Sequence, residues 1–367
     1  MILYVLLAIW IFVLLIIGLI FEEKEIAVSD SEYLIGVNDN NRRICELLCL
    51  LSFLVLWYLT AFRSNKIGND TQNYIYYFNA FERNGFDLAG KVEIGYQFFN
   101  ILVGLFSDDP HIFIIVSATV MYLGLAVYIF KYSKNILVSF CLFFCFFFSV
   151  YVNTLRQGMA MIIVLYAYQY LKKNKNIIAL LLIISAVLFH KTALLALLLF
   201  LQYQLLIDKR TVILGSIIIA GLSITGVFGI IISFVFPWYS QYTESLYASS
   251  GWLGVSYEVL RNTIIFFITY KVADYDNCED RLFMLDLSIL LLLSSMGFAV
   301  NLATRASQYF LLIAIVELPN ILVENRRDSN KYWLFGVSAV SLLMFLFILW
   351  FRPEWNHLYP YELWGGV

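Results

Sequence analysis

Long apolar blocks alternate with short polar segments along the whole chain. The first block, residues 1–21, carries no charged side chain. A helix rises ~1.5 Å per residue, so about 20 apolar residues cross the ~30 Å hydrocarbon core of a bilayer. The pattern predicts an all-α transmembrane bundle of about twelve spans forming one domain, residues 1–367. The spans are expected near residues 2–21, 43–62, 111–131, 136–152, 155–171, 176–189, 192–207, 211–235, 258–272, 282–300, 303–323 and 332–351.

The apolar stretch 176–207 is too long for one straight crossing. Three lysines, at 172, 173 and 175, precede it, and Lys209 and Arg210 follow it. Short cytoplasmic loops collect Lys and Arg, so both clusters belong on the same side of the membrane. We therefore predict two short spans with a turn near His190 and Lys191. The same rule places the N-terminus outside the cytoplasm.

This topology leaves two larger loops, 63–110 and 236–257, on the outer side. The first contains an amphipathic segment near 94–106 that is too short to span and is expected to be an interfacial or re-entrant helix. The second is rich in Trp and Tyr. It fits either an aromatic belt at the headgroup level or a platform on which sugars stack.

Composition narrows the function classes. Hydrophobic residues make up 62% of the chain and charged residues 14%, well below the ~25% of a soluble domain. The net charge of −2 and the lack of a basic domain argue against a nucleic-acid partner. No Walker A motif, Gly-rich dinucleotide loop or His-Glu-x-x-His motif occurs. The uncharged start without a cleavage site is read as a first transmembrane helix and not as a removable signal.

Several charged side chains fall at the predicted outer edge of the membrane. An Arg deep in lipid costs roughly 2.5–3.5 kcal/mol, so Arg156 and Arg305 must either reach the interface or bind an anion. A guanidinium is a planar fork that pairs with phosphate oxygens. The complete set is Arg63, Asp70, Glu93, Arg156, His190, Lys191, Arg261 and Arg305.

Two members of this set have alternative explanations. His190 is one of three histidines and is either a structural residue or a group that contacts phosphate or transfers a proton. Asp70 follows Gly68 closely and fits a turn or a helix N-cap, a role compatible with catalysis. Asp70, Glu93 and Glu258 are all candidates for a general base, and the sequence leaves the choice open.

Five short motifs run in order through most of the chain. They are Arg63-x4-Gly68-x-Asp70-x3-Tyr74, Glu93-x-Gly95-Tyr96, Asn153-x2-Arg156-Gln157-x2-Ala160, Phe189-His190-x-Thr192-Ala193 and Arg305-x3-Tyr309-Phe310. Because these motifs occur in this order, the chain resembles the EpsG family of polymerase-like membrane proteins. That family is related to the Wzy-type O-antigen polymerases.

The resemblance implies a multi-span enzyme without a metal or other cofactor, in a bacterial cytoplasmic membrane, with its site on the outer side. The implied reaction transfers an undecaprenyl-diphosphate-linked glycan to the non-reducing end of another lipid-linked unit, for O-antigen, capsule or exopolysaccharide. Donor and acceptor would be the partners, with a chain-length regulator as an optional one. Arg156 and Arg305 would hold the diphosphate, His190 would assist it or a proton, and Asp70 would serve the acceptor. Further substrate-binding candidates are Arg63, Glu93, Gln157, Lys191, Arg261 and Tyr309.

Two other functions compete with this one. A flippase for lipid-linked oligosaccharides would also need many spans and cations, but should show paired repeats of broken helices, and we find none. A membrane acyltransferase that modifies the polymer would need a histidine deep in a pocket. His190, at an outer turn, fits that chemistry poorly.

Overall fold

The computed structural model describes residues 1–24, 39–87, 92–203, 209–225, 227, 230, 252–324 and 330–365. Within these residues the regular elements are helices, apart from one isolated β-bridge between Arg63 and Leu363. The predicted all-α class is therefore confirmed. Among the described residues, six helices are long and apolar enough to cross a bilayer, namely Ile2–Phe21, Asn41–Ala61, Pro110–Tyr132, Ile136–Asn153, Leu302–Glu324 and Lys331–Phe351. The chain is a membrane protein.

The other six predicted spans correspond to helices that are shorter or more polar. They are α7 (Leu155–Lys172), α8 (Asn176–Val187), the 3₁₀ helix η1 (Lys191–Tyr203), α9 (Lys209–Ile224), α12 (Trp252–Val272) and α13 (Cys278–Met296). The helical run breaks at residues 188–190, between α8 and η1. That these six helices also cross the membrane stays a prediction. Residues 236–251 of the second predicted outer loop lie outside the described residues.

The chain divides into two compact units. The first unit contains Met1–Ile163, Ser185–Lys191 and Arg326–Val367, and the second contains Val164–Ile184 and Thr192–Asn325. The expectation of a single transmembrane domain stays a prediction.

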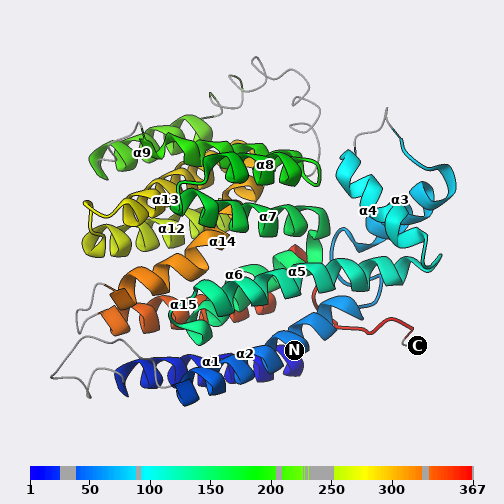
Figure 1. Ribbon diagram of the computed structural model, residues 1–367, viewed down its shortest axis with the longest axis horizontal. Helices are drawn as coiled ribbons and strands as arrows, with labels where there is room; N and C mark the ends of the chain where they lie inside the picture. The colour runs from blue at the N-terminus through cyan, green and yellow to red at the C-terminus, as the bar shows by residue number, and fades with distance from the viewer. Residues whose placement is uncertain are drawn as a thin grey trace. The chain divides into compact units, whose positions relative to one another are not determined.

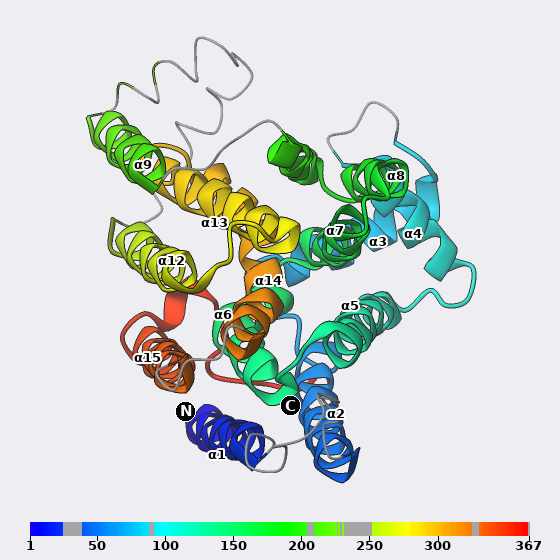
Figure 2. The same ribbon diagram turned by 60° about the vertical axis from the view of Figure 1, so that its left-hand side comes forward.

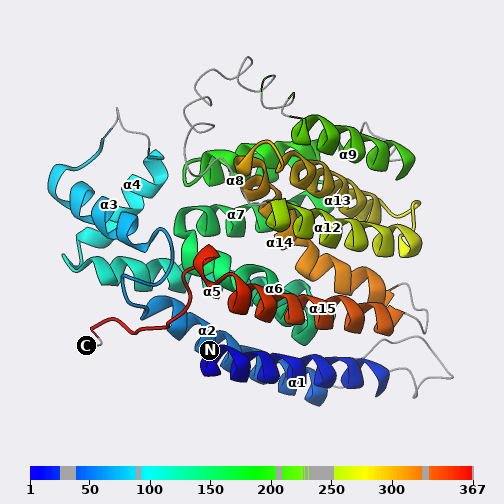
Figure 3. The same ribbon diagram turned by 180° about the vertical axis from the view of Figure 1, so that it is seen from behind.

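Five long helices of the first unit lie side by side: α1 (Ile2–Lys24), α2 (Asp39–Ala61), α5 (Pro110–Tyr132), α6 (Ile136–Asn153) and α15 (Asn330–Phe351) (Figures 1 and 3). The Phe-rich α6 is buried along most of its length. The Phe53 ring of α2 lies 4.7 Å from that of Phe140 and 5.6 Å from that of Phe143, between centroids. Edge-to-face contacts of this kind add to the packing of large rings.

Two short helices, α3 (Thr71–Asn84) and α4 (Ile94–Gly104), stand at one end of this unit (Figures 1 and 3). Helix α4 occupies most of the predicted 94–106 segment and turns its polar side inward. Gln97 is buried, accepts a hydrogen bond from the Asp87 amide at 2.8 Å and donates to the Val92 carbonyl at 2.8 Å. Its outward side is apolar and includes Ile94, Phe98 and Leu102. This distribution suits a helix that meets lipid at the interface.

The chain after α15 runs back along the loop that follows α2. The Ser64 amide donates to the Glu362 carbonyl at 2.8 Å, and the Trp364 amide donates to the Phe62 carbonyl at 2.9 Å. The Trp364 ring stacks on His111, with centroids 4.3 Å apart. The C-terminal tail, residues 353–365, thus fixes the loop that leads into α3.

In the second unit, α13 packs against α9, α12 and α14 (Asn301–Glu324) (Figure 2). Helix α13 begins at an Asn277 cap, whose side chain accepts from the Glu279 amide at 2.9 Å. Its residues from Leu282 to Leu291 are all buried, Asp286 and Ser288 included. A helix that is buried all round needs partners on every side, and these three helices supply them.

Candidate functional site

Glu93 is the centre of a polar cluster in the first unit. It is the residue before α4 and is only 8% exposed. Its Oε2 accepts a hydrogen bond from Arg156 Nη1 at 2.9 Å, and its Oε1 accepts one from the Lys191 amide at 3.2 Å. The cluster therefore joins three motifs that are distant in the sequence.

Arg156 lies in the first turn of α7 between two aromatic rings. Its guanidinium carbon is 5.5 Å from the ring centroid of Tyr96 and 5.7 Å from that of Tyr77, within the range of cation–π attraction. The side chain is 25% exposed. Within the part of the chain that the structure describes, Nη1 is its only nitrogen with a hydrogen-bonded protein partner. Nε and Nη2 are left for a ligand.

His190 stands at the break between α8 and η1. Its Nδ1 lies 3.5 Å from Glu93 Oε1, a contact distance and not a well-formed hydrogen bond. Neither ring nitrogen is hydrogen-bonded to a described residue, although the side chain is only 16% exposed. The neighbouring Lys191 side chain is exposed. The imidazole is thus held beside a carboxylate with Nε2 unused.

A close backbone contact brings this turn to Glu93. The Gly95 amide donates to the Leu188 carbonyl at 2.9 Å. A Cβ at position 95 would lie 2.8 Å from that carbonyl oxygen, so only glycine allows the approach. The role of the Gly95 motif is therefore local: it lets the start of α4 touch the turn that carries His190.

The electrostatics of the cluster favour an ionised Glu93. Burial opposes the charge, but the interaction with His190 and the positive charge of Arg156 outweigh it and lower the Glu93 pKa to about 2. A carboxylate of this kind stays charged at any physiological pH. Glu93 is therefore suited to binding neighbouring donor groups, and it is a weak proton acceptor.

Tyr74 connects the start of α7 to α3. Its hydroxyl accepts from the Leu155 amide at 3.0 Å and donates to the Asn153 carbonyl at 3.2 Å. Burial and then the charge of Asp70 raise the Tyr74 pKa, so the phenol remains a donor. Tyr74 thereby holds the helix start that presents Arg156.

Asp70 precedes α3 at the N-cap position, but its side chain makes no capping hydrogen bond. Its Oδ1 is 3.5 Å from Asn73 Nδ2, and the residue is partly exposed. The turn before it favours glycine: Gly68 has φ +83°, and a Cβ there would lie 3.0 Å from the Val152 carbonyl. The Asp70 carboxylate is thus partly exposed, and among the described residues its side chain has only this long contact with Asn73.

Arg63 is fully buried, which the sequence did not indicate. Its Nε donates to Thr71 Oγ1 at 3.2 Å and its Nη1 donates to the Thr60 carbonyl near the end of α2. Burial lowers its pKa to about 10. These contacts join the end of α2 to the start of α3. Gln157, beside Arg156, is buried as well.

The remaining predicted residues belong to the second unit. Thr192 Oγ1 donates to the buried Tyr309 hydroxyl at 3.3 Å, which links the fourth motif to the fifth. Arg305, one helical turn before Tyr309, is partly exposed. Arg261 Nε donates to Asn262 Oδ1 at 3.1 Å, and its guanidinium lies 5.5 Å from the Tyr257 ring centroid.

Sequence reasoning missed Tyr77, the second ring against Arg156. Tyr77 lies three residues after Tyr74 and so shares its helix face, a signal that was available but not distinctive among so many tyrosines. Leu188 was also missed, because its contribution is a backbone carbonyl.

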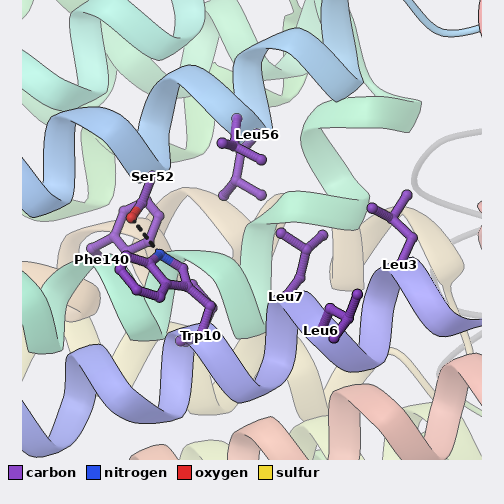
Figure 4. A pocket seen from close by; sticks show the side chains of 9 residues that line it. Leu3, Leu6, Leu7, Trp10, Ser52, Leu56 and Phe140 are labelled. Carbon is purple, nitrogen blue, oxygen red and sulfur yellow. Dashed lines mark hydrogen bonds between the residues drawn. The ribbon is translucent and has the colours of Figure 1, made fainter.

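A cavity of about 250 Å³ lies elsewhere in the first unit, among α1, α2 and α6 (Figure 4). Its lining is apolar apart from Ser52 and the Trp10 nitrogen, which are hydrogen-bonded to each other at 2.8 Å (Figure 4). It offers no charged group to a substrate.

The fold and the cluster define a helical, multi-span membrane protein that presents an arginine, a carboxylate and a histidine together. The chain belongs to the EpsG family, whose model matches residues 46–363. It is thus a membrane protein of polysaccharide biosynthesis. Comparison with curated proteins gave no match, and comparison with solved structures gave none either.

Proposed function

We propose that this protein is a polymerase that joins oligosaccharide repeat units carried on undecaprenyl diphosphate. The observation that supports this most directly is the state of Arg156. One of its nitrogens is held by a buried carboxylate, and Tyr77 and Tyr96 lie within cation–π distance of it. Its remaining donors have no hydrogen-bond partner among the described residues. A guanidinium positioned this way is prepared for a bidentate anion such as a diphosphate.

The reaction requires little beyond positioning and charge stabilisation. The acceptor hydroxyl oxygen forms a bond to the anomeric carbon of the donor glycan, and the bond from that carbon to the diphosphate oxygen breaks. Undecaprenyl diphosphate leaves with the electron pair. Arg156 would stabilise the growing negative charge, helped by the exposed Lys191. For Arg305, in the second unit, we propose diphosphate binding as well.

The proton of the acceptor hydroxyl needs a base. Glu93, with a pKa of about 2, is too weak an acceptor for this task near neutral pH. His190 fits better, because Glu93 faces Nδ1 and Nε2 has no partner among the described residues. We propose that Glu93 orients His190 and that His190 takes the proton.

The other candidates have supporting roles in this proposal. Asp70 would bind the acceptor sugar, since its carboxylate is partly exposed and does not cap α3. Arg261 and Tyr309 would bind substrate in the second unit. Gln157 and Arg63 are buried, so we propose that they support the site without touching the glycan.

The proposal includes the full topology. All twelve predicted spans would cross a bacterial cytoplasmic membrane, with the N-terminus and the Glu93 cluster outside. The lysines at 172, 173 and 175 would then face the cytoplasm, in keeping with the usual bias of short loops. The apolar outer face of α4 would rest in the interface.

The test is reconstitution of the purified protein with undecaprenyl-diphosphate-linked repeat units, without nucleotide sugars, ATP or added metal. We expect a ladder of longer glycans on a gel. Arg156→Ala and Arg305→Ala should reduce the ladder to a trace at the same reaction time, and Arg281→Ala, at an exposed position of α13, should leave it unchanged. Folded protein that makes no ladder but moves the lipid-linked unit across vesicles would be a flippase, and the proposal would be wrong.

A further inference from the structure

A group of charged side chains in the second unit has no part in the mechanism above. It comprises Lys172 of α7, Glu279 and Asp286 of α13, and Glu317 of α14. We propose that Asp286 is a proton-binding site, and that Glu317, Lys172 and Glu279 form the path through which its proton exchanges with water.

Asp286 lies midway along α13 and is 0% exposed. Neither carboxyl oxygen has a hydrogen-bond partner among the described residues. Its neighbours Leu285 and Leu287 are buried as well. An ionised carboxylate that is buried without a protein donor is strongly disfavoured, and the group takes up a proton instead. A polar group of this kind inside a membrane protein is usually retained for a function.

Glu317 lies on α14, which packs against α13, and is 5% exposed. Its Oε1 accepts from Gln169 Nε2 at 3.1 Å and its Oε2 accepts from Lys172 Nζ at 3.1 Å. Of the described groups on the helices around α13, Glu317 is the one whose charge acts on Asp286. Lys172 is therefore paired with Glu317, and among the described residues no cation is hydrogen-bonded to Asp286.

The path to water runs through Lys172. Its Nζ is 3.1 Å from Glu317 and 2.8 Å from Glu279 Oε2. The Glu279 side chain is 54% exposed, in the first turn of α13. The next residue, Asp280, is buried but already accepts from the Asp274 amide at 2.8 Å, so it is occupied by the local turn. The series Glu279, Lys172 and Glu317 thus leads from the surface to the buried carboxylate whose charge acts on Asp286.

The arrangement also indicates why the ligand would be a proton and not a metal cation. Hard cations take six or more oxygen ligands, and Ca²⁺ or Mg²⁺ sites supply several carbonyls or carboxylates. Here the oxygens of Glu317 are already committed to Gln169 and Lys172. Of the two buried carboxylates Asp286 and Glu317, only Asp286 has oxygens without a hydrogen-bond partner among the described residues.

The test uses the full chain in detergent micelles and in vesicles, with dicyclohexylcarbodiimide as the probe. The O–H of a protonated carboxyl adds across a C=N bond of this apolar reagent, and no leaving group is lost. Peptide mass spectrometry should find the adduct on Asp286 at neutral pH, and at least tenfold less on Asp280 and Glu279. Asp286→Asn should remove the adduct while the thermal midpoint of unfolding stays the same or rises.

A second measurement is independent of whether the reagent reaches Asp286. Infrared spectra of the wild-type protein at neutral pH should contain the C=O stretch of a protonated carboxyl, and Asp286→Asn should lack it. Glu279→Gln should slow the deuterium shift of that band. Absence of the band in folded wild-type protein, or protection of Asp286 from the reagent by Na⁺ alone, would overturn the proposal. Neither result depends on whether the protein polymerises glycans.

Discussion

Gly95 and Leu188 meet backbone to backbone, with the Gly95 amide nitrogen 2.9 Å from the Leu188 carbonyl oxygen. The contact joins the start of α4 to the break after α8. It brings Glu93 to His190 and to the Lys191 amide, 98 residues further along the chain. The site therefore depends on position 95, where any side chain would clash with the Leu188 carbonyl.

Gly95→Ala should destabilise the protein and disable the site together. The new Cβ would lie 2.8 Å from a backbone carbonyl, which cannot swing aside. Overpacking of this kind costs about 1–3 kcal/mol. Thermal unfolding in detergent and the glycan ladder should both record the loss. Gly336→Ala on α15 is the matched control, since nothing lies within 4 Å of its Cβ. Equal behaviour of the two variants would contradict this account.

Arg156→Ala should reduce the rate of glycan transfer by roughly 10²–10³, the usual effect of removing one positioned donor to a developing charge. Arg156→Lys keeps the charge but loses the planar fork, so it should recover only a small part. The measurement is single-turnover transfer with saturating lipid-linked donor. Full activity of the lysine variant would show that only the charge of Arg156 matters.

The pH dependence of stability should reveal the Glu93 cluster. The pKa of Glu93 is lower in the folded protein, about 2, than its ordinary value of 4.5. Folding is therefore favoured by this group above pH ~4.5, and the contribution is lost as the pH falls towards 2. Unfolding midpoints measured between pH 7 and 3 should fall less steeply for Glu93→Gln than for the wild type. Parallel curves would mean that Glu93 is not held as an ion.

The C-terminal tail should be needed to hold the loop between α2 and α3. Trp364→Ala removes the stacking on His111, worth about 0.5–1.5 kcal/mol beyond the area buried. We expect a lower unfolding midpoint and faster proteolysis between residues 62 and 70. Trp350→Ala, 64% exposed on α15, should leave that loop protected. Unchanged cleavage in the Trp364 variant would exclude a role for the tail.

Thr192 and Tyr309 should be coupled energetically. Their hydrogen bond of 3.3 Å is the contact between the fourth and fifth motifs. A double-mutant cycle with Thr192→Val and Tyr309→Phe should give a coupling free energy of about 0.5–1.5 kcal/mol in unfolding experiments. Additive effects of the two substitutions would show that the bond contributes nothing.

The sequence alone predicted the helical class and the location in a membrane, because the length of an apolar segment is a local property of that segment. It also placed the break near His190, since the lysine clusters on both sides constrain the number of crossings. It selected Glu93, Arg156 and His190 as polar residues that needed an explanation.

Their roles were decided by tertiary structure. The Glu93–Arg156 pair joins residues 63 positions apart, and no local pattern specifies which carboxylate an arginine will meet. Arg63 and Asp70 lie seven residues apart in one motif, yet packing buries the first completely and leaves the second partly exposed. Asp286 lies inside an apolar block, where the sequence pattern did not mark it as functional. Only the packing of the surrounding helices leaves it without a hydrogen-bond partner among the described residues. Hydrophobicity along the chain determines that helices form and where they reside, whereas long-range packing determines which polar groups face one another.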